Sequence, residues 1–309
     1  MRLLSLLLVL LLLSLPGRPQ AAPFDNSRIE TLAGVSVHVR HWPAAGPGRG
    51  CPVLLVHGFA GSTYSFRFLA PALAAGGHEV WALDLPAYGY SARTPFPGTA
   101  AAALAPWLKE HGAGWCLLGH SMGTRVVAEL VQALPGDVSR VVYLAGNPIP
   151  SAKELRRRER FKSPRLRQWL AGLVERRYLH EEKIGEMLAK AYGRPASDEE
   201  IAGYLTPLRQ PGTALAIMNG YAAQWPATPT GAALDHVPTL ILWGENDTWV
   251  KPEVADRLQA ALPSARRITL AGAGHCPMET HQAQTQEAVL AHFGPAVPVA
   301  QTPEPPRLP

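Results

Sequence analysis

A serine lies between two glycines in the segment Gly119-His120-Ser121-Met122-Gly123, which follows the apolar run 115–118 and precedes a helix-like stretch. This order of strand, GxSxG motif and helix is typical of a nucleophile elbow. Such a tight turn holds its serine in strained backbone geometry and exposes the hydroxyl, and the flanking glycines leave the space that side chains would fill. The sequence therefore indicates Ser121 as a nucleophile.

A serine hydroxyl is a weak nucleophile at neutral pH, so it needs a general base to take its proton and a carboxylate to orient that base. His275 lies in a glycine-rich stretch just past an apolar run, and Asp247 follows the apolar run 239–243. Both positions are the carboxyl ends of expected strands, where open parallel sheets bind their ligands. We expect a relay from Asp247 through His275 to Ser121, with Glu245 as the rival acid.

Apolar runs alternate with helix-like stretches along the chain, and these elements must position the reactive groups. Val35, Val37 and Val39 alternate with polar residues, which predicts a half-buried strand near the edge of a sheet. Continuous apolar runs, typical of buried parallel strands, lie at residues 52–56, 80–83, 115–118, 141–144, 239–243 and 267–270. Helical stretches lie at residues 65–75, 100–110, 122–134, 252–262 and 280–292. The alternation predicts an α/β fold, with a mostly parallel central sheet flanked by helices.

Residues 148–233 contain no strand-like run, and this segment is helical, charged and punctuated by prolines. We therefore expect an inserted helical cap, or lid, on a core made of residues 23–147 and 234–294. Residues 295–309 are rich in proline and poor in charge, which favours a flexible tail.

Two features of the expected cap stand out. Its apolar residues recur at helical spacing in one stretch, which predicts a buried helix face made of Leu166, Trp169, Leu170 and Leu173. A basic cluster precedes that stretch and consists of Lys153, Arg156, Arg157, Arg158, Arg160 and Lys162. A solvated cap surface explains this cluster most simply, and an anion or membrane contact is the alternative.

The composition excludes several classes of protein. The 309 residues are 47% hydrophobic and 17% charged, which is too apolar for a disordered chain. The 28 glycines and 30 prolines follow no triplet period, so a collagen-like fibre is excluded. The net charge of +5 includes Arg2 and Arg18 of the N-terminal segment, and so mild a basicity does not favour a nucleic-acid partner.

The N-terminal segment has the order expected of a secretory signal peptide. Arg2 precedes the apolar run 3–13, and a Pro-Gly pair then leads to the small residues Ala21 and Ala22. The run is shorter than the roughly 20 residues of a membrane-spanning helix. We expect cleavage of this signal peptide of residues 1–22 after Ala21 or Ala22, and export to the periplasm or medium without a stable membrane span. An uncleaved membrane anchor is the alternative.

The chain has three cysteines, Cys51, Cys116 and Cys276, which lack the close spacing of zinc-binding knuckles. A structural metal site is therefore not expected. Export would permit one disulfide, and Cys51 and Cys116 hold similar positions before motifs of adjacent expected strands. Buried free thiols are nevertheless the state we expect.

These motifs together resemble the α/β-hydrolase superfamily, in particular its capped serine esterase-like and lipase-like members, over roughly residues 28–294. The segment His57-Gly58-Phe59-Ala60-Gly61-Ser62 follows an expected strand where relatives shape an oxyanion hole. The resemblance implies that the backbone N–H groups of Phe59 and Met122 stabilise the developing oxyanion. It also implies that Tyr88, in the loop after the next strand, lines the substrate pocket.

The expected activity is that of an exported serine hydrolase that cleaves carboxylic esters through an acyl-enzyme, without cofactor or metal. The cap and its aromatic neighbours suggest a small apolar ester as substrate, lipids and polyesters included. The proposed pocket residues are Tyr64, Tyr88, Trp225 and Trp249, beside Phe59. A serine nucleophile excludes the aspartyl-ester chemistry of the similar capped epoxide hydrolases and haloalkane dehalogenases.

Three alternatives remain open from the sequence. Members with similar motifs cleave carbon–carbon bonds in ring-opened dienones, hydrolyse lactones or peptides, or make peracids as perhydrolases. Other members of the fold are non-enzymatic binding proteins, which commonly lose part of the catalytic triad. The basic cap is also consistent with a protein whose first role is to bind a surface. Neither the oligomeric state nor the acyl preference follows from these patterns.

Overall fold

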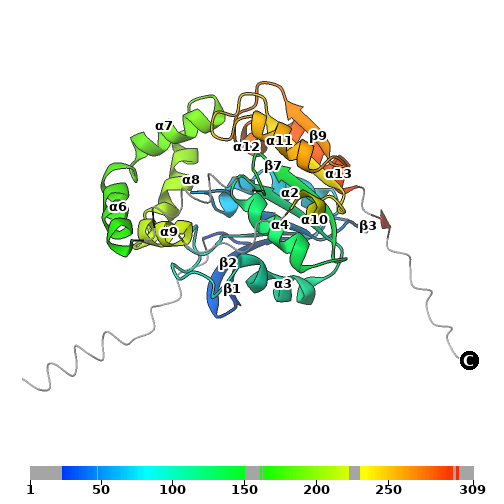
Figure 1. Cartoon of the computed structure of the whole chain (residues 1–309), viewed down its shortest axis with the longest axis horizontal. Coiled ribbons are helices and arrows are strands. Elements are labelled where there is room, and N and C mark those ends of the chain that lie inside the picture. The colour runs from blue at the N-terminus through cyan, green and yellow to red at the C-terminus, as the bar shows by residue number, and fades with distance from the viewer. Residues whose placement is uncertain are drawn as a thin grey trace, which may run out of the picture.

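The structure, a computed structural model, describes residues 23–46, 48–149, 161, 163–222, 230–294 and 297–298 of the 309-residue chain. The strands of its main sheet are β1 (Ser27–Leu32), β2 (Val35–Trp42), β4 (Val53–Val56), β5 (Val80–Leu83), β6 (Trp115–His120), β7 (Val138–Leu144), β8 (Thr239–Gly244) and β9 (Arg266–Leu270). They follow the order β1-β2-β5-β4-β6-β7-β8-β9 (Figure 1). Strand β2 runs antiparallel to both neighbours, and the other pairs of the sheet are parallel.

Helices flank this sheet, and the α/β fold predicted from the sequence is thereby confirmed. They are the short 3-10 helix η1 (Thr63–Phe66), α2 (Leu69–Ala75), α3 (Ala100–His111), α4 (Gly123–Ala133), α10 (Gly231–Leu234), α11 (Glu253–Ala261), α12 (Pro277–Thr280) and α13 (Gln282–Phe293). Helix α3 packs against α4, and α2 packs against α13.

The central strands are continuously apolar because helices cover both faces of a parallel sheet. Every residue of β4, β5, β6 and β8 is buried. Strand β4 pairs with β5 on one side and with β6 on the other, so the order of the strands reverses beside it. Such a switch point opens a crevice at the carboxyl ends of the strands. The end of β6 in this crevice carries the GxSxG motif.

The strand expected near the sheet edge, now β2, has an outer neighbour that the sequence pattern did not reveal. Strand β1 pairs with β2 through a two-residue turn of Ala33 and Gly34, whose φ angles are 48° and 79°. Positive φ at both positions is typical of the tight turns that match the twist of a hairpin. Because β1 lies at the solvent-exposed edge, it carries polar residues and lacks an apolar pattern.

A second, two-stranded sheet joins the C-terminal segment to the connection between β2 and β4. Strand β10 (Val297–Pro298) pairs antiparallel with β3 (Gly48–Arg49). Val297 and Pro298 belong to the segment 295–309, for which the sequence favours a flexible tail. The pairing is made by backbone groups, which a reading of side-chain patterns does not detect.

The helices of the cap lie in the chain between β7 and β8. They are α6 (Pro164–Arg177), α7 (Glu181–Tyr192), α8 (Asp198–Leu208) and α9 (Thr213–Ala222). Helix α6 packs against α9, and α7 packs against α8. A capping box, in which Ser197 and Glu200 exchange hydrogen bonds between side chain and backbone, begins α8. Figure 1 shows these helices together on one side of the sheet.

The predicted buried face of the helix at residues 164–177 is wrong, although the helix itself is present. Leu166 and Trp169 are 37% and 61% exposed. Leu170 and Leu173 are only partly buried. Helix α6 buries Ala171 instead. Apolar spacing predicted the helix correctly, but a neighbouring helix decides which of its sides is covered.

Cys51 and Cys116 form a disulfide, so the expectation of free thiols is wrong for this pair. The parallel register of β4 and β6 places Val53 beside Cys116 and brings the two cysteine Cα atoms to 5.8 Å, within the usual range for a disulfide. Cys276 is free and buried, as expected.

Three expectations lie outside the described residues. They concern the signal peptide of residues 1–22, the basic cluster between residues 153 and 162, and Trp225. Within the described part of the chain, no helix combines the length and the apolar character needed to cross a bilayer.

Candidate active site

The turn between β6 and α4 has the strained geometry expected of a nucleophile elbow. Ser121 has a φ of 50°, in the left-handed region of the backbone that residues other than glycine rarely adopt. A Cβ atom on Gly119 would lie 2.6 Å from the backbone of Gly123, and one on Gly123 would lie 2.3 Å from the carbonyl oxygen of Val56. Only glycine fits at either position, which explains the GxSxG spacing. The Ser121 N–H donates to the carbonyl oxygen of Leu144 at 2.9 Å and fixes the turn to β7.

Three side chains that are far apart in the sequence form one hydrogen-bonded chain. Ser121 Oγ lies 3.0 Å from His275 Nε2, and His275 Nδ1 lies 2.7 Å from Asp247 Oδ2. His275 and Asp247 are buried. Asp247 accepts two further hydrogen bonds, from the backbone N–H groups of Trp249 and Val250, so its carboxylate is fixed in place. With Nδ1 donating to the carboxylate, Nε2 is free to accept the serine proton.

The rival acid, Glu245, has a different partner. Its carboxylate accepts a hydrogen bond from the Gly272 N–H at 2.9 Å and thereby shapes the loop that precedes His275. The carboxylate that contacts His275 Nδ1 is thus that of Asp247 and not that of Glu245.

The other histidines near Ser121 support loops and do not contact its hydroxyl. His120 Nε2 donates to the carbonyl oxygen of His275 at 2.9 Å, and burial lowers the pKa of His120 to about 3. His57 Nε2 accepts from the Leu85 N–H, and burial lowers the pKa of His57 as well. Both imidazoles are therefore neutral at physiological pH. Burial disfavours the charged form of a side chain, and a neutral imidazole can still make these hydrogen bonds.

The segment proposed as the oxyanion loop passes directly beside the nucleophile. A Cβ atom on Gly58 would lie 2.9 Å from Ser121 Cβ, so the backbone approaches closely there. The far end of the segment is held by buried Asp84, whose Oδ1 accepts from the Thr63 N–H at 2.6 Å. Met122 is the N-cap residue of α4, where helix N–H groups point outward and favour negative charge.

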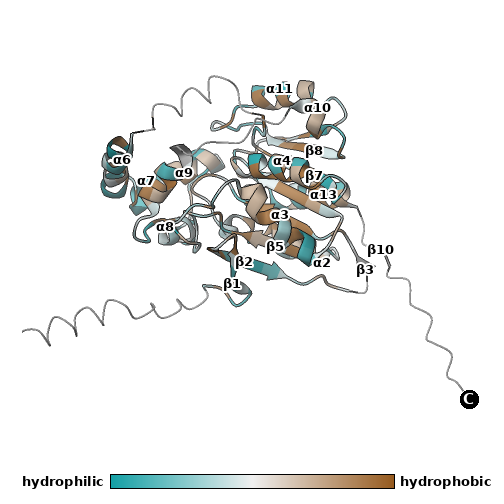
Figure 2. Cartoon of the chain, turned by 60° about the horizontal axis from the view of Figure 1, so that its bottom comes forward, coloured by the Kyte–Doolittle hydropathy of each residue, from teal (hydrophilic) through white to brown (hydrophobic). Residues whose placement is uncertain are grey.

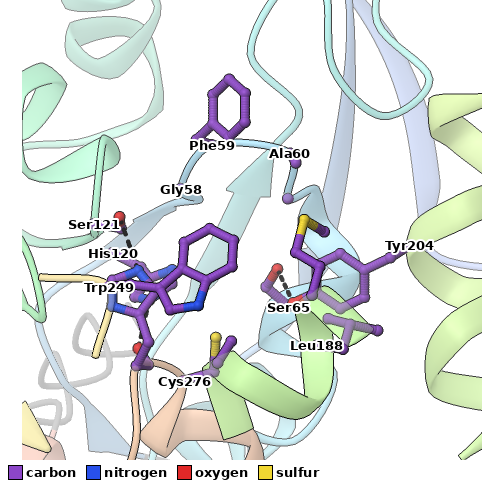
Figure 3. Close-up of a pocket in the computed structure, with 14 residues that line it drawn as sticks. Gly58, Phe59, Ala60, Ser65, His120, Ser121, Leu188, Tyr204, Trp249 and Cys276 are labelled. Atoms are coloured by element: carbon purple, nitrogen blue, oxygen red, sulfur yellow. Dashed lines mark hydrogen bonds between the residues drawn. The ribbon is translucent and has the colours of Figure 1, made fainter. Parts of the chain in front are cut away.

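A cavity of about 50 Å³ opens beside Ser121 and His275 (Figure 3). Of the aromatic residues proposed for it, Phe59 and Trp249 do line this cavity. The Trp249 ring stacks on the His275 imidazole, with ring centroids 5.7 Å apart and planes within 11°. Figure 3 shows the Trp249 side chain near Ser121, with Phe59 on the loop above.

Two other aromatic residues proposed for the pocket do not line this cavity. Tyr64 packs edge-on against Tyr204 and bonds to the backbone of α8 through its hydroxyl, outside the cavity lining. Tyr88 is buried behind the lining, edge-on to His57 and Phe59. Tyr88 lies in the loop after β5, as expected, whereas Tyr64 lies in η1, and neighbouring aromatic rings pack against both side chains.

Cap residues that the sequence did not single out complete the cavity wall. Met187 and Leu188 come from α7 and Tyr204 comes from α8, and Cys276 of the core lies in the same wall. Tyr204 and Leu188 face the cavity in Figure 3. The apolar spacing of α7 indicates a buried face, but it does not say that this face meets the relay.

A buried polar cluster ties the cap to the core next to the cavity. Glu279 of α12 accepts from Tyr192 Oη at 2.8 Å and from Tyr204 Oη at 2.5 Å, and it forms an ion pair with Arg67. Ser65 Oγ bonds to the same Tyr204 hydroxyl at 2.9 Å. Burial raises the pKa of Glu279, although the charge of Arg67 opposes the rise. Residues of α7, α8, η1 and α12 thus share one hydrogen-bond network.

The described residues contain no group of three or more His, Cys, Asp or Glu side chains arranged to hold a metal ion. The relay, in contrast, consists of the groups that acyl transfer requires.

Comparison with known proteins agrees with this architecture. Residues 52–282 match the family described as alpha/beta hydrolase fold. The chain is 28% identical over 264 residues to YugF of Bacillus subtilis, named an uncharacterized hydrolase, and the match covers 79% of this chain and 89% of that protein.

Solved structures share the fold at lower sequence identity. The epoxide hydrolase CorEH has a TM-score of 0.69 at 20% identity, covering 86% of this chain and 98% of its own. The carbazole-degradation serine hydrolase CarC has a TM-score of 0.66 at 18% identity, with the same coverage. The family match spans most of the chain and includes the elbow and both loops of the relay, so this protein belongs to the α/β hydrolase fold family.

Proposed function

We propose that this chain is an exported serine hydrolase that cleaves carboxylic esters through an acyl-enzyme on Ser121. The observation that carries the proposal is the relay of Asp247, His275 and Ser121, with links of 2.7 Å and 3.0 Å, at the wall of a cavity. Membership of the α/β hydrolase fold family supports hydrolysis as the reaction class. The signal-like segment at residues 1–22 supports export.

In the first half-reaction, Ser121 Oγ attacks the ester carbonyl carbon while His275 Nε2 takes the hydroxyl proton. Asp247 stabilises the imidazolium that forms. The carbonyl oxygen becomes an oxyanion, which the N–H groups of Phe59 and Met122 are proposed to stabilise. The tetrahedral intermediate collapses, the bond to the alcohol oxygen breaks, and His275 gives its proton to the departing alcohol.

In the second half-reaction, water replaces the alcohol. His275 takes a proton from the water as its oxygen attacks the acyl carbon, and it returns that proton to Ser121 Oγ when the acyl–enzyme bond breaks. The products are the carboxylic acid and the regenerated serine. No step needs a group beyond these side chains, two backbone amides and water.

The nucleophile separates this chemistry from that of one structural neighbour. The name of CorEH describes an epoxide hydrolase, but at 20% identity that likeness supports the fold alone. Aspartyl-ester chemistry requires a carboxylate nucleophile, and a serine occupies the elbow here. This difference favours acyl transfer over epoxide opening.

The cavity wall favours a small apolar acyl group. Phe59, Met187, Leu188 and Trp249 supply apolar surface, and the volume of the cavity is about 50 Å³. A cavity this small is filled by a few non-hydrogen atoms. We therefore propose esters with short acyl chains as the preferred substrates.

Hydrolysis of p-nitrophenyl esters with acyl chains of two to twelve carbons tests the proposal. The wild-type protein should cleave the shortest esters fastest, and a fluorophosphonate probe should label Ser121, as read by peptide mass spectrometry. Ser121→Ala should abolish labelling and leave only residual turnover. Ser139→Ala, at an exposed serine of β7, is the matched control and should retain both.

Two results would change the assignment. Labelling of Ser121 without cleavage of any ester, together with turnover of a ring-opened dienone or a lactone, would retain the nucleophile and replace the substrate. Unchanged ester hydrolysis in Ser121→Ala would refute the mechanism itself.

A further inference from the structure

Helix α6 of the cap carries large apolar side chains on its outer surface. Trp169 and Leu166 are 61% and 37% exposed, and Leu173 beside them is partly buried. Steps of three and four residues separate these positions, so the three side chains lie on one face of the helix. Figures 1 and 2 both show α6 at the side of the cap that points away from the sheet. We call Leu166, Trp169 and Leu173 the outer face of α6.

The packing of α6 lies on its other side. Ala171 is its buried residue, and it is two positions from both Trp169 and Leu173, which places it about 200° around the helix from each. Arg167, four positions before Ala171, donates from Nε to Asn219 Oδ1 of α9 at 2.8 Å. Helix α9 thus covers the Ala171 side and leaves the outer face exposed.

Exposed arginines flank this apolar face. Arg165 precedes Trp169 by four residues, Arg176 follows it by seven, and Arg177 follows Leu173 by four, so each lies next to the outer face. All three arginines are exposed. Glu175 is the single acidic residue among the fourteen of α6. Tryptophan and leucine bordered by arginine form the pattern of a helix that lies in the interface of a membrane.

We propose that the outer face of α6 docks the cap onto an anionic lipid bilayer. Trp169, Leu166 and Leu173 enter the boundary between headgroups and acyl chains, and the three arginines contact anionic headgroups. Helix α6 has 14 residues, fewer than the roughly 20 needed to span a bilayer, so it lies in the plane of the surface. This inference is independent of the proposed ester chemistry, because none of these residues belongs to the relay.

Sedimentation with sucrose-loaded vesicles tests the docking. Vesicles of phosphatidylcholine with 30% phosphatidylglycerol are compared with vesicles of phosphatidylcholine alone, using the full chain in low salt. The protein should sediment with the anionic vesicles and remain in solution with the neutral ones. Neutralising one arginine should weaken binding about five-fold, because one basic residue near an anionic surface contributes about that factor.

Two variants and two matched controls locate the surface. Leu166→Ser with Trp169→Ser removes the apolar face, and Arg165→Glu with Arg176→Glu and Arg177→Glu reverses its charge; both should abolish sedimentation. Ile29→Ser changes another exposed apolar residue, at the edge strand β1. Lys109→Glu with Arg257→Glu and Arg266→Glu changes the net charge equally, at exposed sites on α3, α11 and β9. Binding should persist in the Ile29→Ser variant. It should weaken only modestly in the variant with Lys109→Glu, Arg257→Glu and Arg266→Glu.

The outcomes that overturn the proposal are distinct. Every variant carries the same N-terminal segment and the same basic cluster at residues 153–162, so equal binding by all of them would assign the membrane contact to one of those two segments. Equal binding to neutral vesicles, or no binding at all, would also refute the proposal. Conversion of a dimer into a monomer by Leu166→Ser with Trp169→Ser, seen by light scattering, would show that the face contacts a second copy instead.

One further variant separates docking from substrate binding. Ser121→Ala should bind anionic vesicles as the wild type does, since the relay takes no part in docking. Loss of vesicle binding in that variant would mean that the protein is held through its active site, and the α6 proposal would fail while the proposed function stood.

Discussion

The backbone N–H of His275 donates a 2.7 Å hydrogen bond to the carbonyl oxygen of Ala191, in the last turn of cap helix α7. Thr248, next to Asp247, donates from Oγ1 to the carbonyl oxygen of Lys190 at 3.4 Å. The last carbonyls of a helix have no partner within it. At the end of α7, the loops that carry His275 and Asp247 supply those partners. The position of the cap and the geometry of the relay are therefore coupled.

Gly274→Ala tests this coupling. A Cβ atom at residue 274 would lie 2.4 Å from the Ala191 carbonyl oxygen, so the loop and α7 must separate. We expect kcat for a short-chain ester to fall about 100-fold, because a displacement of about 1 Å at a catalytic group has that effect. Gly220→Ala in α9, with no atom within 4 Å of the added Cβ, is the control and should retain kcat. An unchanged kcat in Gly274→Ala would show that the contact is dispensable.

Asp247→Asn and Glu245→Gln distinguish the two acids. Asn at residue 247 keeps the size of the side chain but favours the wrong tautomer of His275, so kcat should fall on the order of 10⁴-fold. Glu245→Gln changes a side chain that bonds to the Gly272 N–H, and kcat should fall less than ten-fold, a rough bound for a group outside the relay. Steady-state kinetics of both variants provides the measurement, and the reverse ranking would exchange their roles.

Glu279→Gln should destabilise the protein by about 3 kcal/mol, because it removes the fully buried counter-charge of Arg67 and leaves only the more distant Glu200 carboxylate at 3.6 Å. The free energy of unfolding in urea provides the measurement. Glu186→Gln breaks an ion pair with Lys183 at a carboxylate that is 57% exposed, and it should cost less than about 0.5 kcal/mol. Similar losses in the two variants would contradict a structural role for the buried pair.

His120 should make the protein less stable in mild acid. Burial lowers the pKa of His120 to about 3, below its ordinary 6.5, so the unfolded chain takes up the proton first. Its contribution is complete above pH 6.5 and is lost as the pH falls towards 3, which amounts to about 2 kcal/mol at pH 5. His120→Gln should remove this part of the difference in unfolding free energy between pH 7 and pH 5. His236→Gln, at an exposed histidine, should preserve it.

Loss of the Cys51–Cys116 disulfide should lower the free energy of unfolding by about 2 to 4 kcal/mol, because the bond closes a loop with a sequence separation of 65. The double variant Cys51→Ser with Cys116→Ser is compared with the oxidised and reduced wild type. Reductant should weaken the wild type and leave the double variant unchanged. A non-reducing peptide map without the Cys51–Cys116 pair would contradict the structure.

The features that could be predicted from the sequence are those that depend on a few neighbouring residues. The runs that became β4, β5, β6 and β8 are apolar throughout because both faces of the sheet are covered, and this signal needs no knowledge of neighbours. Ser121 could be found because two glycines and a strand–helix boundary define its turn. Strand β1 and the β3–β10 pair were missed, since an exposed edge and a backbone pairing leave no apolar pattern.

Contacts between distant elements explain the errors. The outer face of α6 is exposed because no other described element packs against it. Tyr64 and Tyr88 lie outside the cavity lining because aromatic side chains of other segments pack against them. The disulfide likewise depends on the register of two strands.

By itself, the amino-acid sequence determined the fold class, the elbow and the identities of the groups expected in the relay, because each depends on residue types within one strand and the turn that follows it. The tertiary structure decided that Asp247 rather than Glu245 faces His275, that α7 and α8 close the cavity, and that α6 turns an apolar face outward. Those outcomes depend on packing between segments far apart in the chain. Local periodicity carries no information about the partner that a given face will meet.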